Sequence, residues 1–124
     1  MSDVARQLAA FMAEYERAAN SHDVRQVLPL IAEDATYWFT DGSYCGREEI
    51  AGAFERTFAT IRDEVYELRE LEWFALADEV AACRYRFSWQ GVVDGQARSG
   101  RGRGTNVLVN RDGSWRVQHE HLSH

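Results

Sequence analysis

The stretch of sequence most informative about the fold is Trp115-Arg116-Val117-Gln118-His119-Glu120-His121-Leu122-Ser123. Residues two apart on a β-strand point to the same face of the sheet, so Trp115 and Val117 share a face with His119 and His121. If the tryptophan and the valine turn toward a core, both imidazoles point into the same interior. A neutral histidine in such a place can act as a general acid or base near neutral pH.

Three further strand-like segments precede this one, over residues 65–77, 80–93 and 98–110. Two of the breaks between strands carry an Asp-Gly pair, at Asp94-Gly95 and Asp112-Gly113. Such pairs are strong hairpin signals because both residues tolerate positive φ. The second half of the chain is therefore predicted to form long antiparallel strands.

The first half of the chain is mostly helical. Apolar residues recur at three- and four-residue steps over residues 4–19 and again over 46–62, which is the spacing of one buried helical face. Asp23 can cap a short second helix, and a β-branched and aromatic strand follows over residues 35–40. This order predicts one α+β domain over residues 1–124, with three N-terminal helices packed on one face of a curved antiparallel sheet.

Composition excludes several classes of function. All 14 basic residues are arginines, so chemistry that needs a lysine amine, such as pyridoxal phosphate attachment or a P-loop, is absent. The net charge of -6 disfavours nucleic acid as a partner. No apolar run approaches the roughly 18 residues that span a bilayer, so we expect no membrane partner and a cytoplasmic location. Cys45 and Cys83 are too few and too far apart for a metal knuckle.

Three stretches resemble a known superfamily: Tyr15-Glu16-Arg17-Ala18-Ala19-Asn20-Ser21-His22-Asp23, Gly46-Arg47-Glu48-Glu49-Ile50, and the Trp-x-Val-x-His-x-His-x-Ser close of residues 115–123. They are similar to SnoaL-like and nuclear transport factor 2-like proteins. The close resembles the SnoaL-like branch related to the association domain of calmodulin-dependent kinases. The resemblance implies a cone-shaped, cystatin-like roll with a pocket between sheet and helices, and it implies a homodimer.

Because aromatic residues are the candidates for lining this pocket, we expect a small, partly apolar organic molecule as its partner. If the chain is an enzyme, we expect acid-base chemistry without a cofactor, such as isomerisation, cyclisation or dehydration. The alternative is a noncatalytic binding or association module, because one fold hosts many functions.

Steroid isomerases of this fold allow a comparison residue by residue. Tyr15 falls where they carry the tyrosine that donates to the substrate carbonyl oxygen, and their second, protonated acid falls near Thr105. Their general base falls at Phe39, which cannot take a proton, so that particular mechanism is not expected. Asp41, two positions further along the strand, is a candidate for a displaced base.

The candidate catalytic residues are therefore Tyr15, Asp41, His119 and His121. The alternative for the two histidines is a structural role, and no third ligand at a fixed spacing completes a metal site, so no metal is expected. The candidate ligand-binding aromatics are Trp38, Phe54, Phe58, Trp73, Tyr85 and Trp89. Arg103 with Thr105 is a candidate clamp for a carboxylate, and the alternative is that the strand arginines face solvent or an interface.

Overall fold

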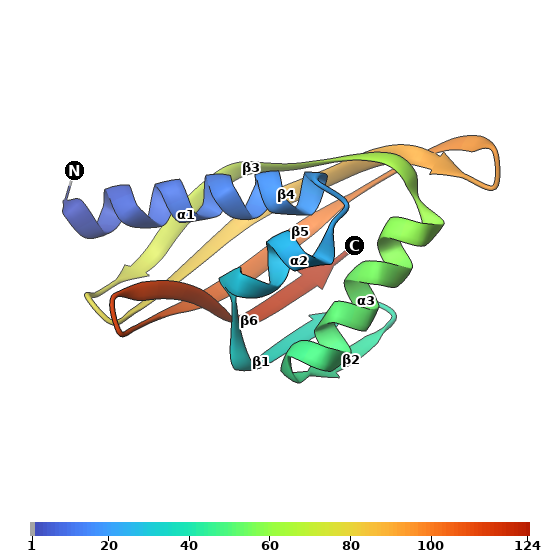
Figure 1. Cartoon of the computed structure of the whole chain (residues 1–124). Coiled ribbons are helices and arrows are strands. Elements are labelled where there is room, and N and C mark those ends of the chain that lie inside the picture. Colours follow the sequence, from blue (N-terminus) through green and yellow to red (C-terminus); the bar gives the residue numbers. More distant parts are fainter. Residues whose placement is uncertain (1) are drawn as a thin grey trace.

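The computed structural model describes residues 2–124 and has helices and strands in the predicted order (Figure 1). The helical elements are α1 (Asp3–Asn20), α2 (Val24–Val27), the 3-10 turn η1 (Leu28–Leu30) and α3 (Gly46–Thr60). The strands are β1 (Ile31–Phe39), β2 (Gly42–Cys45), β3 (Arg62–Leu76), β4 (Val80–Val93), β5 (Gln96–Arg111) and β6 (Ser114–Ser123). The predicted α+β class, a curved sheet with three helices, is confirmed.

The six strands form one sheet in the order β2-β1-β6-β5-β4-β3. The predicted hairpins are present: Asp94 and Gly95 connect β4 to β5, Asp112 and Gly113 connect β5 to β6, and all four residues have positive φ. The sheet is mixed rather than wholly antiparallel, because β1 inserts beside the last strand of the chain and runs parallel to it.

Helix α1 lies along the edge strand β3 (Figure 1). Its buried residues are Leu8, Met12, Tyr15 and Ala18, which share one face at helical spacing. Asn20 exchanges two hydrogen bonds with the backbone of Tyr66, at 2.7 and 2.8 Å. The carboxylate of Glu16 accepts a third bond from the backbone N–H of Leu68, at 2.7 Å. These bonds fix the helix on the sheet and hold Tyr15 over its inner face.

Helix α3 covers the inner face of the sheet near β1 and β2 (Figure 1). It buries Ile50 and Ala53, and its Phe54 ring meets the Tyr37 ring edge-on at 6.1 Å between centroids. Among residues 2–124, no helix is long and apolar enough to span a membrane.

Candidate functional site

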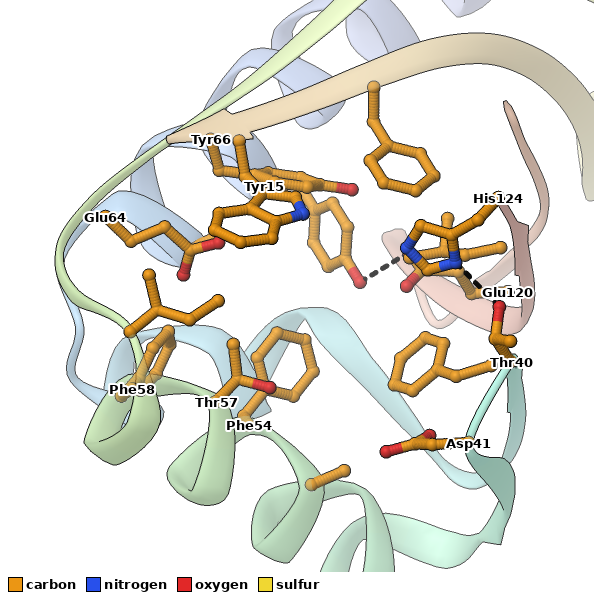
Figure 2. Close-up of a pocket in the computed structure, with 17 residues that line it drawn as sticks. Tyr15, Thr40, Asp41, Phe54, Thr57, Phe58, Glu64, Tyr66, Glu120 and His124 are labelled. Atoms are coloured by element: carbon orange, nitrogen blue, oxygen red, sulfur yellow. Dashed lines mark hydrogen bonds between the residues drawn. The ribbon is translucent and has the colours of Figure 1, made fainter. Parts of the chain in front are cut away.

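A cavity of about 330 Å³ lies on the inner face of the sheet, between α1 and α3 (Figure 2). Seven of its lining residues are Phe, Tyr or Trp, and they come from α1, α3 and the strands: Tyr15, Phe39, Phe54, Phe58, Tyr66, Phe87 and Trp89. A concave, mostly apolar cavity with a few polar groups is the usual form of a small-molecule site.

The carboxyl of Glu120 is the central polar group of this cavity. Its residue is only 3% exposed. Every hydrogen bond that it accepts goes to Oε1: from the Tyr15 hydroxyl at 2.8 Å, from Asn106 Nδ2 at 3.2 Å and from the Tyr85 hydroxyl at 3.5 Å. Within residues 2–124 no donor bonds Oε2, which leaves that oxygen available to a ligand.

Burial raises the pKa of Glu120 to about 7, although the hydrogen bonds from Tyr15, Asn106 and Tyr85 act in the opposite direction. Both protonation states are therefore populated near neutral pH. The pKa of Tyr15 is raised well above its ordinary value, chiefly by burial and then by the neighbouring Glu120 charge. Tyr15 thus stays protonated, and its oxygen lies 2.6 Å from the Tyr37 hydroxyl oxygen.

A β-bulge in β6 turns Glu120 into the cavity. Before the bulge, Trp115 and Val117 are buried as predicted. The pairing with β5 then shifts by one residue. Val117 lies opposite Leu108 and His119 lies opposite Val107, so β6 has one residue between these pairs where β5 has none. One extra residue on a strand reverses the facing of every residue that follows it. The next inward residue is therefore Glu120, which the regular alternation had placed on the outer face.

The prediction that His119 and His121 face the cavity is consequently wrong. Both imidazoles lie on the outer face of the sheet and meet the Trp38 ring edge-on, at 5.1 and 5.8 Å between centroids. The Thr36 hydroxyl lies 2.7 Å from His119 Nδ1. Trp38 is 50% exposed, so it does not line the cavity either. In the part of the chain that the structure describes, no cluster of three His, Cys, Asp or Glu side chains could hold a metal.

The family model described as the SnoaL-like domain matches residues 8–124, nearly the whole of the sequence. The chain belongs to the SnoaL-like domain family. Curated proteins gave no significant match to this SnoaL-like domain.

Solved structures share the fold of the SnoaL-like domain at low sequence identity. A nuclear transport factor 2-like superfamily protein from Salmonella enterica has a TM-score of 0.89 and 18% identity over 97% of this chain and 89% of its own. A protein from Xanthomonas campestris is provisionally named a calcium/calmodulin dependent protein kinase II association domain. It has a TM-score of 0.85 and 22% identity over 98% of this chain and 88% of its own. A provisionally named scytalone dehydratase from Novosphingobium aromaticivorans has a TM-score of 0.83 and 16% identity over 94% of this chain and 80% of its own.

The SnoaL-like domain brings together part of the predicted site. Five of the predicted residues line the cavity: Tyr15, Asp41, Phe54, Phe58 and Trp89. Asp41 is exposed, and its Oδ1 accepts a hydrogen bond from the Tyr44 hydroxyl at 3.3 Å. Tyr85 lies behind the cavity wall, where its hydroxyl donates to Asn106 Oδ1 at 2.8 Å.

Besides Trp38 and Tyr85, three more of the predicted ligand-binding residues lie outside the cavity lining. Arg103 and Thr105 are on the outer face, because Gly104 and Asn106 take the buried, inward positions of β5. A carboxylate clamp in the cavity is therefore wrong, whereas the alternative of exposed arginines holds for Arg103. Trp73 packs against the hydrophobic core beyond the cavity, after a register shift in β3.

Glu120 and Asn106 are the functional candidates that the sequence did not reveal. A glutamate between two histidines on a strand looks like an ordinary solvent-facing charge. Asn106 was the stronger clue, because it stands two residues before Leu108 and so shares the inward face of a central strand with an apolar side chain. A buried asparagine needs polar partners, and Tyr85 and Glu120 supply them.

Proposed function

We propose that this SnoaL-like domain binds a small, largely apolar organic molecule in its cavity and moves a proton on that molecule without a cofactor. The observation that carries the proposal is the Glu120 carboxyl, buried among aromatic rings with a pKa of about 7. A general acid or base works best when its pKa lies near the working pH. The same carboxyl group can then accept a proton in one step and donate it in the next.

The chemistry starts from ionised Glu120, which takes a proton from a carbon next to a ligand carbonyl group. An enolate and a neutral carboxyl result. If a C=C bond adjoins that carbon, the enolate is a dienolate, and return of the proton from Glu120 to its far carbon isomerises the ligand. If a β-hydroxyl group is present, Glu120 gives the proton to that group as its C–O bond breaks, which releases water and leaves Glu120 ionised. Tyr15 remains the donor throughout, because its hydroxyl holds its proton and can stabilise whichever oxygen carries the negative charge. The dehydratase name of one neighbour of this fold supports the elimination.

Binding is tested first with thermal unfolding against a panel of aromatic and polycyclic ketones and alcohols, because a ligand of the native state raises the melting temperature. We expect at least one ketone to bind, and we expect Tyr15→Phe to weaken it by roughly threefold to tenfold through loss of one hydrogen bond. Glu67→Gln, at an exposed residue of β3 that does not line the cavity, serves as the control and should leave the affinity unchanged. The proposal fails if no compound binds, or if both variants change the affinity equally.

A second proposal concerns self-association, the alternative function and the basis of a homodimer. The outer face of the sheet exposes Trp38, flanked by the His119 and His121 rings. Exposed aromatic side chains are enriched in protein interfaces. A neighbour of the same fold provisionally named an association domain also supports this role. We propose that two copies of the chain pack through this face.

Sedimentation velocity tests this second proposal. The wild-type protein should sediment as a dimer, and Trp38→Glu should give monomers, because it buries an unpaired charge at the contact. Ala13→Glu introduces the same charge on the exposed side of α1 and should leave the dimer intact. A wild-type monomer, or a dimer that survives Trp38→Glu, contradicts the proposed interface.

A further inference from the structure

Glu64 brings a second carboxylate into the cavity. The residue is 8% exposed and lines the wall, and Figure 2 shows its carboxylate directed toward the interior. Within residues 2–124 no hydrogen-bond donor reaches that carboxylate. His22 lies nearby, but its Nε2 contacts the backbone carbonyl oxygen of Glu64, at 2.8 Å. The two carboxylate oxygens open onto the cavity and receive no donor from the described residues, so a ligand in the cavity can supply the hydrogen bonds that water otherwise makes.

The backbone is distorted at the point that places Glu64. Between Arg62 and Val65 the pairing with β4 slips by one residue, and Asp63 takes a left-handed conformation with φ of 54°. Opposite, Gly91 has no room for a side chain, since an added Cβ would lie 2.8 Å from the Arg62 carbonyl oxygen. Bulges and non-glycine residues at positive φ are concentrated at functional sites, where they aim a side chain.

The charges around the cavity favour a cation over an anion. Three carboxyl groups line it, those of Asp41, Glu64 and Glu120. None of the 14 arginines does so, and His124 is the one basic side chain among the lining residues. An anionic ligand would meet repulsion with no guanidinium to balance it. The pKa of Glu64 is above its ordinary value because burial raises it, although the nearby His22 acts in the opposite direction.

The surroundings of Glu64 suit one class of donor. The cavity that it shares is lined by the rings of Phe58, Tyr66 and Trp89. A protonated amine supplies the missing hydrogen bonds and the compensating charge, and aromatic faces attract it through cation–π interactions. A neutral hydroxyl group supplies only the hydrogen bond.

We propose that the ligand of this cavity is an arylalkyl amine, with its nitrogen on a saturated carbon, whose ammonium group is bound by the carboxylate of Glu64. The inference rests on the proposed function and narrows it, because it names the chemical class of the molecule that the cavity takes. The apolar body of the ligand lies among the aromatic rings, and Glu64 fixes its basic end.

A matched set of three compounds tests the inference: naphthylethylamine, naphthylethanol and naphthylacetate of one ring isomer. Their dissociation constants are measured by calorimetry for the wild type, Glu64→Gln and Glu67→Gln. Glu67 is the control because it is an exposed glutamate on the same strand. In the wild type and in Glu67→Gln, the amine should bind at least about tenfold more tightly than the alcohol, with the acid weakest. Glu64→Gln should abolish the preference for the amine.

The outcomes separate the inference from the function on which it rests. Equal affinity for all three compounds in the wild type overturns the amine class, while it supports the cavity as a binding site. Preference for the amine that persists in Glu64→Gln shows that another group binds it, which also overturns the inference. If neutral aryl ketones bind and none of the three compounds does, only the inference fails. If the ketones do not bind either, the proposed function fails with it.

Discussion

Glu120→Gln is expected to raise the free energy of unfolding at pH 8 by about 3 kcal/mol. The pKa of Glu120 is about 7 in the folded protein and 4.5 in the reference state. Between these values the folded state binds the extra proton, so the stability contributed by this proton is lost as the pH rises. A glutamine stays neutral at every pH, and it therefore escapes this loss.

Urea unfolding at pH 4.5 and at pH 8 measures the effect. At the lower pH the wild-type carboxyl is largely neutral in the fold, so the two proteins should differ little; at the higher pH the variant should be the more stable. Glu67→Gln, an exposed glutamate on β3, should match the wild type at both values. Stability curves of wild type and Glu120→Gln that stay parallel across this pH range would show that Glu120 ionises normally.

The same substitution should have the opposite effect on activity. An amide cannot accept a proton, so turnover of a substrate found in the ligand panel should fall by roughly 10²- to 10⁴-fold. A protein that gains stability when one side chain is neutralised, and loses its reaction at the same time, keeps that side chain for function. Turnover that survives the substitution would contradict the proposed role of Glu120.

Gly104→Ala is expected to destabilise the fold by about 3 kcal/mol, from overpacking and from a broken hydrogen bond. An added Cβ would lie 2.4 to 2.7 Å from three atoms of the Tyr85 side chain. The rigid ring must move, and its hydroxyl then loses Asn106. Because Asn106 also bonds Glu120, the change should reach the cavity as well.

Chemical denaturation of Gly104→Ala and a second glycine variant gives the comparison. At Gly52, inside α3, the nearest atom is the mobile tip of Arg56 at 3.3 Å. Gly52→Ala should therefore stabilise the protein, by up to about 1 kcal/mol, through helix propensity. Equal effects of the two substitutions would mean that the Tyr85 ring does not constrain β5.

The sequence predicted the elements better than it predicted the site. Periodicity and the Asp-Gly pairs are local signals, so the hairpins and α1 are where they were expected. The position of β1 beside β6 depends on tertiary contacts, and no local pattern carries it. The bulge before Glu120 could not be predicted either, because nothing in the sequence of residues 115–123 indicates where the extra residue lies. Because of this one extra residue, the cavity receives the carboxyl of Glu120 in place of the two predicted imidazoles.

The hydrogen bonds from α1 to β3 have a consequence for how the protein behaves at high concentration. A free strand edge is a template on which another chain can add, and this is the route to domain swapping and to fibrils. Around Tyr66 and Leu68 that template is already occupied by the side chains of Asn20 and Glu16. The opposite edge, β2, has only four residues. Lateral growth of the sheet is thus blocked beside the cavity, and the broad outer face is the surface left for the association that we propose.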